Sequence, residues 1–176
     1  MTAKLHIGSG TWYYNGAGWI NVDADANNQV DIVASALHLP FPDGLFDQVY
    51  MGHFLEHIPF ALIPTVIKEL LRASTQNVRI AAVGPCMRLA REQASPQWLY
   101  DAIEALDPPD PHPGSHAWTA TTELTYEALT MSGLDAQEVH ISKVARPEWP
   151  NPNHYAEWQC AFLAWRKQES GGSNSK

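Results

Sequence analysis

Two glycines and one aspartate near the N-terminus have the spacing of a nucleoside-binding turn. Residues 5–10 read Leu-His-Ile-Gly-Ser-Gly, and Asp23 ends the later run Trp-Ile-Asn-Val-Asp. Glycine lets the backbone approach a ligand closely, and a carboxylate at the end of the next strand can accept hydrogen bonds from both hydroxyls of a ribose. Because Gly-x-Gly also occurs in ordinary tight turns, the later segments must decide between the two interpretations.

A second pattern with possible chemistry is His53-Phe-Leu-Glu-His57, which matches the H-x-x-E-H string of some zinc peptidases. In those sites both histidines lie on one face of a helix and the glutamate activates a water. Here the string directly follows a predicted strand, and Pro59 stands two residues after it. A zinc hydrolase is therefore the less favoured alternative, and no metal is expected. Cys86 and Cys160 form no C-x-x-C pair and are expected to be reduced structural thiols.

Alternating strands and helices are predicted to position these residues. Apolar, β-branched and aromatic runs predict strands at residues 4–7, 19–23, 30–34, 46–51, 78–83, 136–141 and 157–166. Helical spacing predicts helices at 59–73, 87–106 and 121–132, with Pro64 in the first turn of the first helix and Gly133 ending the last. This order predicts an α/β protein: a Rossmann-like, doubly wound, mainly parallel sheet with helices on both faces, an antiparallel late strand and a shortened first crossover.

Composition narrows the classes of partner. The 176 residues carry a net charge of −8 with no basic cluster, so a nucleic-acid partner is not expected. The sequence contains no run of about 18 apolar residues, so no membrane span is predicted. The N-terminus lacks the apolar stretch of a secretory signal, so a cytoplasmic location is expected. We expect one domain over residues 1–167 and a disordered Gly/Ser-containing tail over 168–176.

Four motifs occur together in one order. They are Leu5-His-Ile-Gly-Ser-Gly10, Ile20-Asn-Val-Asp23, Leu39-Pro-Phe-Pro-Asp-Gly-Leu-Phe-Asp47 and His53-Phe-Leu-Glu-His-Ile-Pro59. Over residues 4–166 the chain resembles class I S-adenosylmethionine-dependent methyltransferases, close to the small methyltransferase type 11-like group. The resemblance implies a Rossmann-like fold, S-adenosylmethionine as cofactor, S-adenosylhomocysteine as product and a small-molecule acceptor.

The resemblance also assigns residues to the cofactor. Gly8 and Gly10 match the turn under the methionine moiety, and Asp23 matches the acid that binds the ribose hydroxyls. Residues 35–37 match the segment beside the adenine, and His53 faces the reacting methyl as the candidate catalytic residue. The whole implied cofactor set is His6, Gly8, Ser9, Gly10, Asp23, Ala24, Ser35, Ala36, Leu37, Gly52 and His53.

A proline-rich loop over residues 107–118 is a candidate acceptor site. It contains four prolines and two histidines. His112, His116 and Trp118 could clamp a flat or polar substrate there. A surface loop with one buried tryptophan is the alternative interpretation.

Three departures from the family pattern support an alternative of another class. His6 stands where many members have an acid, and Ser35 replaces the usual aspartate. The interval from Gly10 to Asp23 is too short for a full crossover helix. Methyl transfer needs mainly an in-line arrangement of acceptor and methyl, so a strong catalytic motif is not required. A non-catalytic methyltransferase-like binding or regulatory module remains the second hypothesis.

Overall fold

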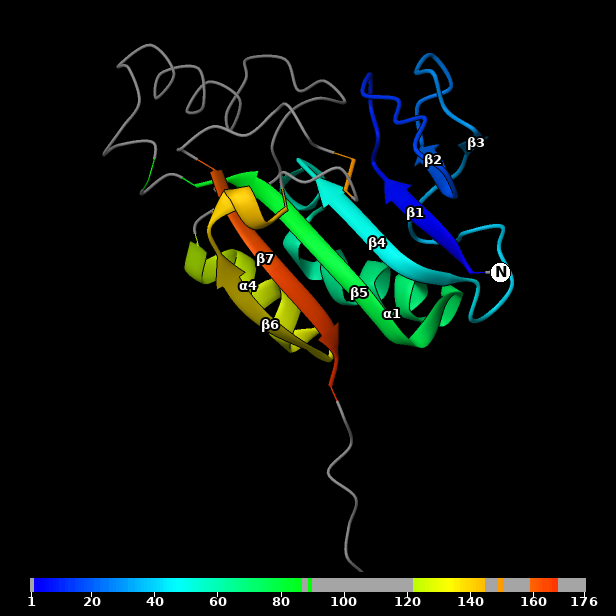
Figure 1. Ribbon diagram of the computed structural model, residues 1–176. Coiled ribbons are helices and arrows are strands. Elements are labelled where there is room, and N and C mark those ends of the chain that lie inside the picture. The colour runs from blue at the N-terminus through cyan, green and yellow to red at the C-terminus, as the bar shows by residue number, and fades with distance from the viewer. Residues whose placement is uncertain (1, 87–88, 90–121, 145–148, 151–158, 168–176) are drawn as a thin grey trace, which may run out of the picture.

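A seven-stranded sheet with the order β3-β2-β1-β4-β5-β7-β6 is the frame of the molecule (Figure 1). The computed structural model describes residues 2–86, 89, 122–144, 149–150 and 159–167. The five strands from β1 to β5 pair in parallel, whereas β7 is antiparallel to both of its neighbours. This confirms the predicted Rossmann-like α/β sheet with an antiparallel late strand. The strands are β1 (Ala3–Ile7), β2 (Trp19–Asp23), β3 (Ile32–Val33), β4 (Phe46–Gly52), β5 (Ser74–Pro85), β6 (Leu134–Val139) and β7 (Gln159–Arg166).

The two described α-helices lie together on one face of the sheet (Figure 1). They are α1 (Ile63–Ala73), which follows the short 3-10 helices η1 (Leu55–His57) and η2 (Phe60–Leu62), and α4 (Thr122–Met131). Helices on both faces were predicted; in the described part of the chain both α-helices lie on this face, and the other face carries the short 3-10 helix η3 (Ile141–Lys143). None of the described helices is long and apolar enough to cross a membrane.

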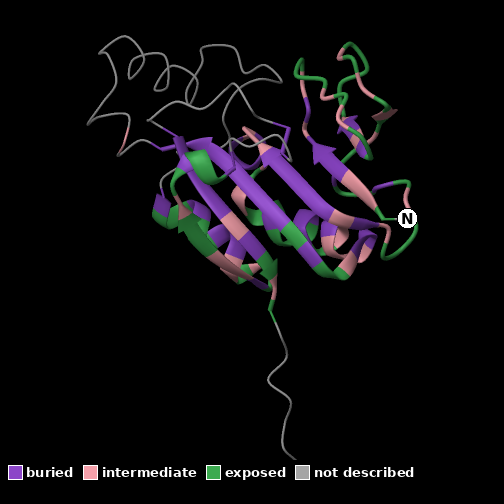
Figure 2. Cartoon of the chain, viewed as in Figure 1, coloured by how far each residue is buried: buried purple, intermediate pink, exposed green. Residues whose placement is uncertain are grey.

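Helix α1 presents one apolar stripe to the core, as its periodicity predicts. Its buried residues follow helical spacing, and buried residues of the sheet cover them from the other side (Figure 2). Pro64 lies in the first turn, where its missing N–H breaks no helical hydrogen bond. Gly133 ends α4 with a φ of 87°, the left-handed conformation expected of a helix stop. The buried positions of α1 are Ile63, Val66, Ile67, Leu70 and Ala73.

The first crossover is a helix-free loop over residues 8–18, which confirms its predicted shortening. Four aromatic rings pack near this loop, on the face of the sheet opposite α1. Tyr14 lies 5.9 Å from Trp19 between ring centroids, Trp19 lies 6.1 Å from Trp149, and Trp149 lies 6.3 Å from Tyr50. We call these four residues the aromatic cluster. They bury apolar surface where a crossover helix would otherwise cover the sheet.

Two strands differ in length from their predictions for local reasons. Strand β3 covers two residues rather than five, because the carboxylate of Asp31 accepts the backbone N–H of Asn21 at 2.7 Å and so replaces a ladder bond. Strand β5 starts at Ser74, four residues early, directly after α1. Its first four residues are all polar, and Gln76 and Asn77 are exposed, so no hydrophobic pattern marks them as a strand.

An ionic cluster ties α1 to the loop before β4. Arg72 pairs with Glu69 at 2.7 Å and Asp43 at 2.6 Å, and Glu69 also accepts the backbone N–H of Leu39 at 2.8 Å. The guanidinium and a backbone hydrogen bond together lower the pKa of Glu69 to about 2. The Leu39–Asp47 motif is therefore held against the helix.

Some predictions fall outside the described residues. The predicted loop over 107–118, the tail over 168–176 and, apart from Leu89, the predicted helix over 87–106 lie there. The single domain over 1–167 stays a prediction. Cys86 and Cys160 are both buried and free.

Candidate functional site

The candidate site lies at the carboxyl edge of the sheet, between β1 and β4. These neighbouring strands are parallel, but the chain continues from β1 toward β2 on one side and from β4 toward β5 on the other. In open α/β sheets such a switch point leaves a crevice where ligands bind. The glycine turn follows β1 and His53 follows β4, so both flank this crevice.

The glycine turn and Asp23 are in direct contact. The backbone N–H of Gly10 donates to Asp23 Oδ2 at 2.8 Å, and the N–H of Asp25 donates to Oδ1 at 2.9 Å. Gly8 and Gly10 have φ values of 64° and 53°. A Cβ on Gly8 would lie 2.3 Å from Phe54, whereas a Cβ on Gly10 would meet nothing within 4 Å. Gly8 thus accommodates a protein ring, and Gly10 faces open space in which a ligand can approach the backbone.

A cavity of about 810 Å³, here the large cavity, opens beside this turn. Its size falls within the range of about 300–1,000 Å³ typical of ligand sites. Leu37 and Leu62 are 43% and 40% exposed in its wall, so each offers an apolar surface to a flat ligand. Eight of the predicted cofactor residues line it: Gly8, Gly10, Asp23, Ala24, Ser35, Ala36, Leu37 and His53.

A second cavity of about 230 Å³, here the small cavity, adjoins the large one. Gly8, Gly10, Thr11 and His53 belong to both walls. The three other predicted cofactor residues line the small cavity rather than the large one. They are His6, Ser9 and Gly52.

His53 is held in a strained backbone conformation between the two cavities. Its φ is 50°, the one positive value of a non-glycine residue in the described part of the chain. Such strain persists where surrounding contacts impose it, often at functional sites. The backbone N–H donates to Val83 of β5 at 2.8 Å, and Nδ1 lies 3.2 Å from Glu56 Oε1. Gln159 brings its Nε2 to 2.5 Å from the Nε2 of His53.

His6 is a buried, neutral member of a polar network. Burial lowers its pKa to about 4, although its Nδ1 donates to Asn21 Oδ1 at 3.0 Å. The Asn21 amide in turn donates to Asp31 Oδ2 at 2.9 Å and to the carbonyl of Tyr14 at 2.9 Å. His6 therefore replaces the acid of the family pattern with a side chain that ties β1 to β2. Ser35 has a similar local role, because its Oγ accepts the N–H of Leu37 at 3.2 Å.

The H-x-x-E-H string does not have the geometry of a helical zinc motif. His53 has a left-handed backbone, and residues 55–57 form a single 3-10 turn. His53 and His57 therefore do not share the i, i+4 face of an α-helix that such a site needs. Among the described residues there is no group of three or more His, Cys, Asp or Glu side chains that could hold a metal.

Several residues of the site have no counterpart in the sequence predictions. Thr11, Asp25, Asn27 and Asn28 line the large cavity from loops after β1 and β2. Their position after parallel strands is a signal that could have found them, because such loops meet at one edge of the sheet. Gln159 follows a segment with no functional motif and offers no such signal. The predicted acceptor residues His112, His116 and Trp118 lie outside the described residues.

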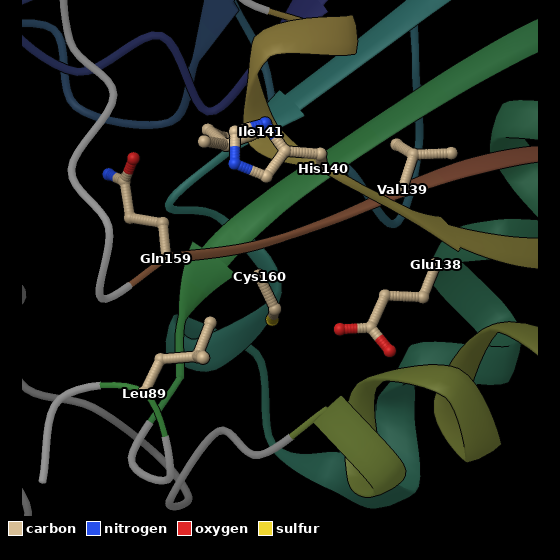
Figure 3. A pocket seen from close by; sticks show the side chains of 7 residues that line it. All are labelled: Leu89, Glu138, Val139, His140, Ile141, Gln159 and Cys160. Atoms are coloured by element: carbon tan, nitrogen blue, oxygen red, sulfur yellow. The ribbon is translucent and has the colours of Figure 1, made fainter. Parts of the chain in front are cut away.

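Gln159 connects His53 with a third cavity, of about 450 Å³, at the far side of the sheet edge. Figure 3 shows Gln159 and Cys160, neighbours at the start of β7, pointing to opposite sides of the strand. Gln159 is thus directed away from the helix-covered face and toward the loops that carry the site.

Comparisons with known proteins agree with this geometry. Residues 17–82, from the end of the first loop into β5, match the family model of a methyltransferase domain. The chain is 31% identical over 120 residues to the chloroplastic tocopherol O-methyltransferase of Arabidopsis thaliana, a match that covers 67% of this chain and 33% of that protein. The chain therefore spans about a third of the length of this curated relative.

Two solved structures have the same fold at low identity. A SAM-dependent methyltransferase from Archaeoglobus fulgidus superposes with a TM-score of 0.61 at 17% identity, covering 93% of this chain and 85% of that one. A methyltransferase from Methanosarcina mazei gives 0.61 at 16% identity, covering 95% and 93%. The strand order, the glycine turn in contact with Asp23 and the match to a methyltransferase domain across β2 to β5 thus agree in making this chain similar to S-adenosylmethionine-dependent methyltransferases, whose fold it has.

Proposed function

We propose that this protein binds S-adenosylmethionine in the large cavity and transfers its methyl group to a small-molecule acceptor. The observation that carries the proposal is the contact between Asp23 and the glycine turn, because it places a carboxylate beside open space next to Gly10. When bound, the cofactor would supply an activated methyl group on a sulfonium. The chain's own residues would bind it, orient it and exclude water.

The described residues fit the parts of this cofactor. Asp23 retains acceptor capacity on both oxygens for ribose hydroxyls, since each oxygen accepts one backbone hydrogen bond in the structure. Leu37 and Leu62 offer apolar surface to the adenine, near Ala24 and residues 35–36. His53, at the boundary with the small cavity, is the proposed residue at the methyl end. His6, Ser9 and Gly52 belong to the acceptor side in this assignment.

The departures from the family pattern do not remove this cavity. His6 and Ser35 make local hydrogen bonds, and the large cavity keeps its carboxylate and its apolar walls. This supports cofactor binding over a module without a ligand. The proposal also includes a cytoplasmic location and a partner that is not a nucleic acid, supported by the free cysteines and the net charge of −8.

Calorimetry with S-adenosylhomocysteine tests the proposal directly. A carboxylate hydrogen bond contributes about 1.5–3 kcal/mol, so Asp23→Asn should weaken binding by about tenfold or more. Asp135→Asn, on the distant strand β6, is the matched control and should bind as the wild type does. Absence of binding to the wild type, or equal affinity in Asp23→Asn, would contradict the proposal.

A further inference from the structure

Two free cysteines lie side by side where β5 ends and β7 begins. Gly84 pairs with Cys160 in antiparallel register, and Cys86 follows two residues after Gly84, so both cysteine side chains point to the same face of the sheet. Their side chains are hydrogen-bonded to each other. The sequence contains no other cysteine. We call these two residues the thiol pair, and its sulfur atoms are close enough to react with each other.

Hydrogen-bond donors surround the sulfur of Cys86. The thiol of Cys160 donates to it, and so do the backbone N–H groups of Leu89 and Thr122. Oγ1 of Thr122, the first residue of α4, lies 3.2 Å from the same sulfur. The hydrogen bond from Cys160 and these further donors lower the pKa of Cys86 to about 5, although burial opposes the shift. The thiol pair therefore holds one thiolate and one thiol at neutral pH.

The third cavity gives a small oxidant access to the thiol pair. Cys160 lines this cavity, and Figure 3 shows its sulfur on the side of β7 where Leu89 and Glu138 lie. The cavity holds about 450 Å³, whereas a water molecule in the liquid occupies about 30 Å³, so hydrogen peroxide fits. Cys86 is fully buried, which excludes a bulky thiol reagent. The reagent that the structure admits is therefore a small peroxide.

A bond between the two sulfurs must move the start of β7. Diagonal neighbours on adjacent antiparallel strands lie about 7–8 Å apart, and cysteines whose Cα atoms are more than about 7 Å apart are not bridged without backbone movement. Gln159 directly precedes Cys160, and its Nε2 lies 2.5 Å from the Nε2 of His53. The movement that closes the bond therefore shifts the Gln159 amide relative to the His53 ring.

We propose that Cys86 and Cys160 form a reversible disulfide when hydrogen peroxide reaches them from the third cavity. Closure of this disulfide displaces Gln159 from His53, so the candidate site becomes sensitive to oxidants. Disulfides in reducing compartments are usually transient and redox-sensing, which suits a pair that is free in the structure. The disulfide forms whether or not the protein transfers methyl groups, so its test is independent of the proposed function.

The oxidation proceeds in two steps. The Cys86 thiolate attacks one oxygen of hydrogen peroxide, the O–O bond breaks, and the leaving hydroxide takes the Cys160 proton and departs as water. The Cys160 thiolate then attacks the sulfenic sulfur of Cys86. The S–S bond forms as the S–O bond breaks, and the second hydroxide leaves as water with a proton from solvent. The sulfurs lose two electrons to the peroxide, and an added dithiol reverses the reaction by thiol–disulfide exchange.

The first experiment follows the covalent change in the whole folded chain. Reduced protein is treated with hydrogen peroxide, unfolded in iodoacetamide and analysed by mass spectrometry. The wild type should lose both alkylatable thiols and two hydrogen atoms, and its digest should contain one linked peptide with Cys86 and Cys160. Dithiothreitol should restore both thiols. Cys86→Ser and Cys160→Ser should each form no bond within the chain.

The rate of this oxidation tests the donors around Cys86. Thr122→Val keeps the size of the side chain but removes the hydroxyl beside the sulfur, so it should slow disulfide formation severalfold. Thr130→Val is the matched control on the same helix, because the Thr130 hydroxyl donates to the carbonyl of Tyr126 instead. This control should be oxidised at the wild-type rate. Equal rates in all three proteins would contradict the stabilised thiolate.

The second experiment records the His53 ring directly. In protein labelled with 15N-histidine, the ring signals of His53 are assigned by their absence in His53→Asn. Oxidation should shift these signals in the wild type, whereas those of His38, an exposed histidine that lines none of the three cavities, should stay in place. In Gln159→Leu the amide is missing, so oxidation should change the His53 signals much less.

The outcomes separate the disulfide, its coupling to the site and the proposed function. Persistence of both thiols in peroxide, a bond between two chains, or sulfinic acid at one cysteine without a disulfide would overturn the disulfide. A disulfide without any change in the His53 signals would overturn the coupling. A protein that oxidises as expected but binds no S-adenosylhomocysteine would overturn the proposed function alone.

Discussion

The two halves of the sheet share one apolar core, to which β1 and β2 contribute Leu5, Ile7 and Val22, but they differ in what else joins their strands. The half formed by β4, β5, β7 and β6 packs apolar side chains against α1 and α4, with Phe162 and Leu129 fully buried between them. The half formed by β1, β2 and β3 has no described helix of its own and is joined by the polar network of His6, Asn21 and Asp31.

This difference places function where hydrogen bonds, rather than apolar packing, determine the geometry. Apolar packing is non-directional and tolerates only close-packed side chains, so it forms a rigid platform. Polar groups need specific partners and leave backbone edges accessible to a ligand. The glycine turn and Asp23 belong to the polar half, whereas His53 and Glu56 belong to the platform. The two cavities lie where the halves meet.

The largest effect on stability should come from the apolar half. Phe162→Ala should lower the free energy of unfolding by about 3–5 kcal/mol, because it leaves a cavity in the core. Trp165→Ala on the same strand is the matched control, and its effect should be much smaller because Trp165 is exposed. Urea denaturation measures both variants. Similar losses of unfolding free energy in the two variants would mean that burial of Phe162 does not stabilise this half.

Within the polar half, loss of the Asn21 side-chain amide should have the largest effect on stability. Asn21→Leu removes the side-chain hydrogen bonds of Asn21 to buried His6 and to the half-buried backbone of Tyr14, at about 1–3 kcal/mol for each buried group that loses its partner, whereas Asp31 keeps the backbone N–H of residue 21. We expect a loss of about 3 kcal/mol in the free energy of unfolding and weaker binding of S-adenosylhomocysteine. Gln137→Leu, at an exposed position of β6, should be nearly neutral. A stable Asn21→Leu variant with full affinity would contradict the role of the network.

His6 should make the polar half sensitive to mild acid. Its pKa is about 4 in the fold and 6.5 in the unfolded chain, so the unfolded chain binds the proton first. Stability should be highest above pH 6.5 and should fall toward pH 4, by at most about 3 kcal/mol. Thermal denaturation at a series of pH values measures this loss. In His6→Gln the loss over this interval should be reduced, and an unchanged pH profile would show that His6 is not its source.

The smallest effect should come from Glu69, in the platform, at a more acidic pH. Arg72 and the backbone lower its pKa from 4.5 to about 2, so its contribution is present above pH 4.5 and is lost as pH falls to about 2. Because Arg72 is about a third exposed, we expect no more than about 1 kcal/mol. Glu69→Gln should lose this acid dependence while His6 keeps its own. If Glu69→Gln also removed the loss of stability assigned to His6, the two halves would not titrate independently.

Local sequence patterns predicted much of this fold because local physics determines it. The stripe of α1, the stop at Gly133 and the turn at Gly10 each depend on periodicity or on backbone freedom at one residue. The length of β3 was not predictable in this way, since it depends on the Asp31 side chain reaching Asn21 ten positions away. Strand β5 was predicted too short because pairing, not hydrophobicity, extends it.

The sequence alone determined which chemical groups are present and which strands carry them, because glycine turns, strand ends and ordered motifs are properties of short segments. Only the tertiary structure decided how these groups are divided between two cavities. His53 and Gln159 are 106 positions apart, and no local pattern links them. They meet because β7 inserts antiparallel between β5 and β6, which brings its first residue to the edge where β4 ends.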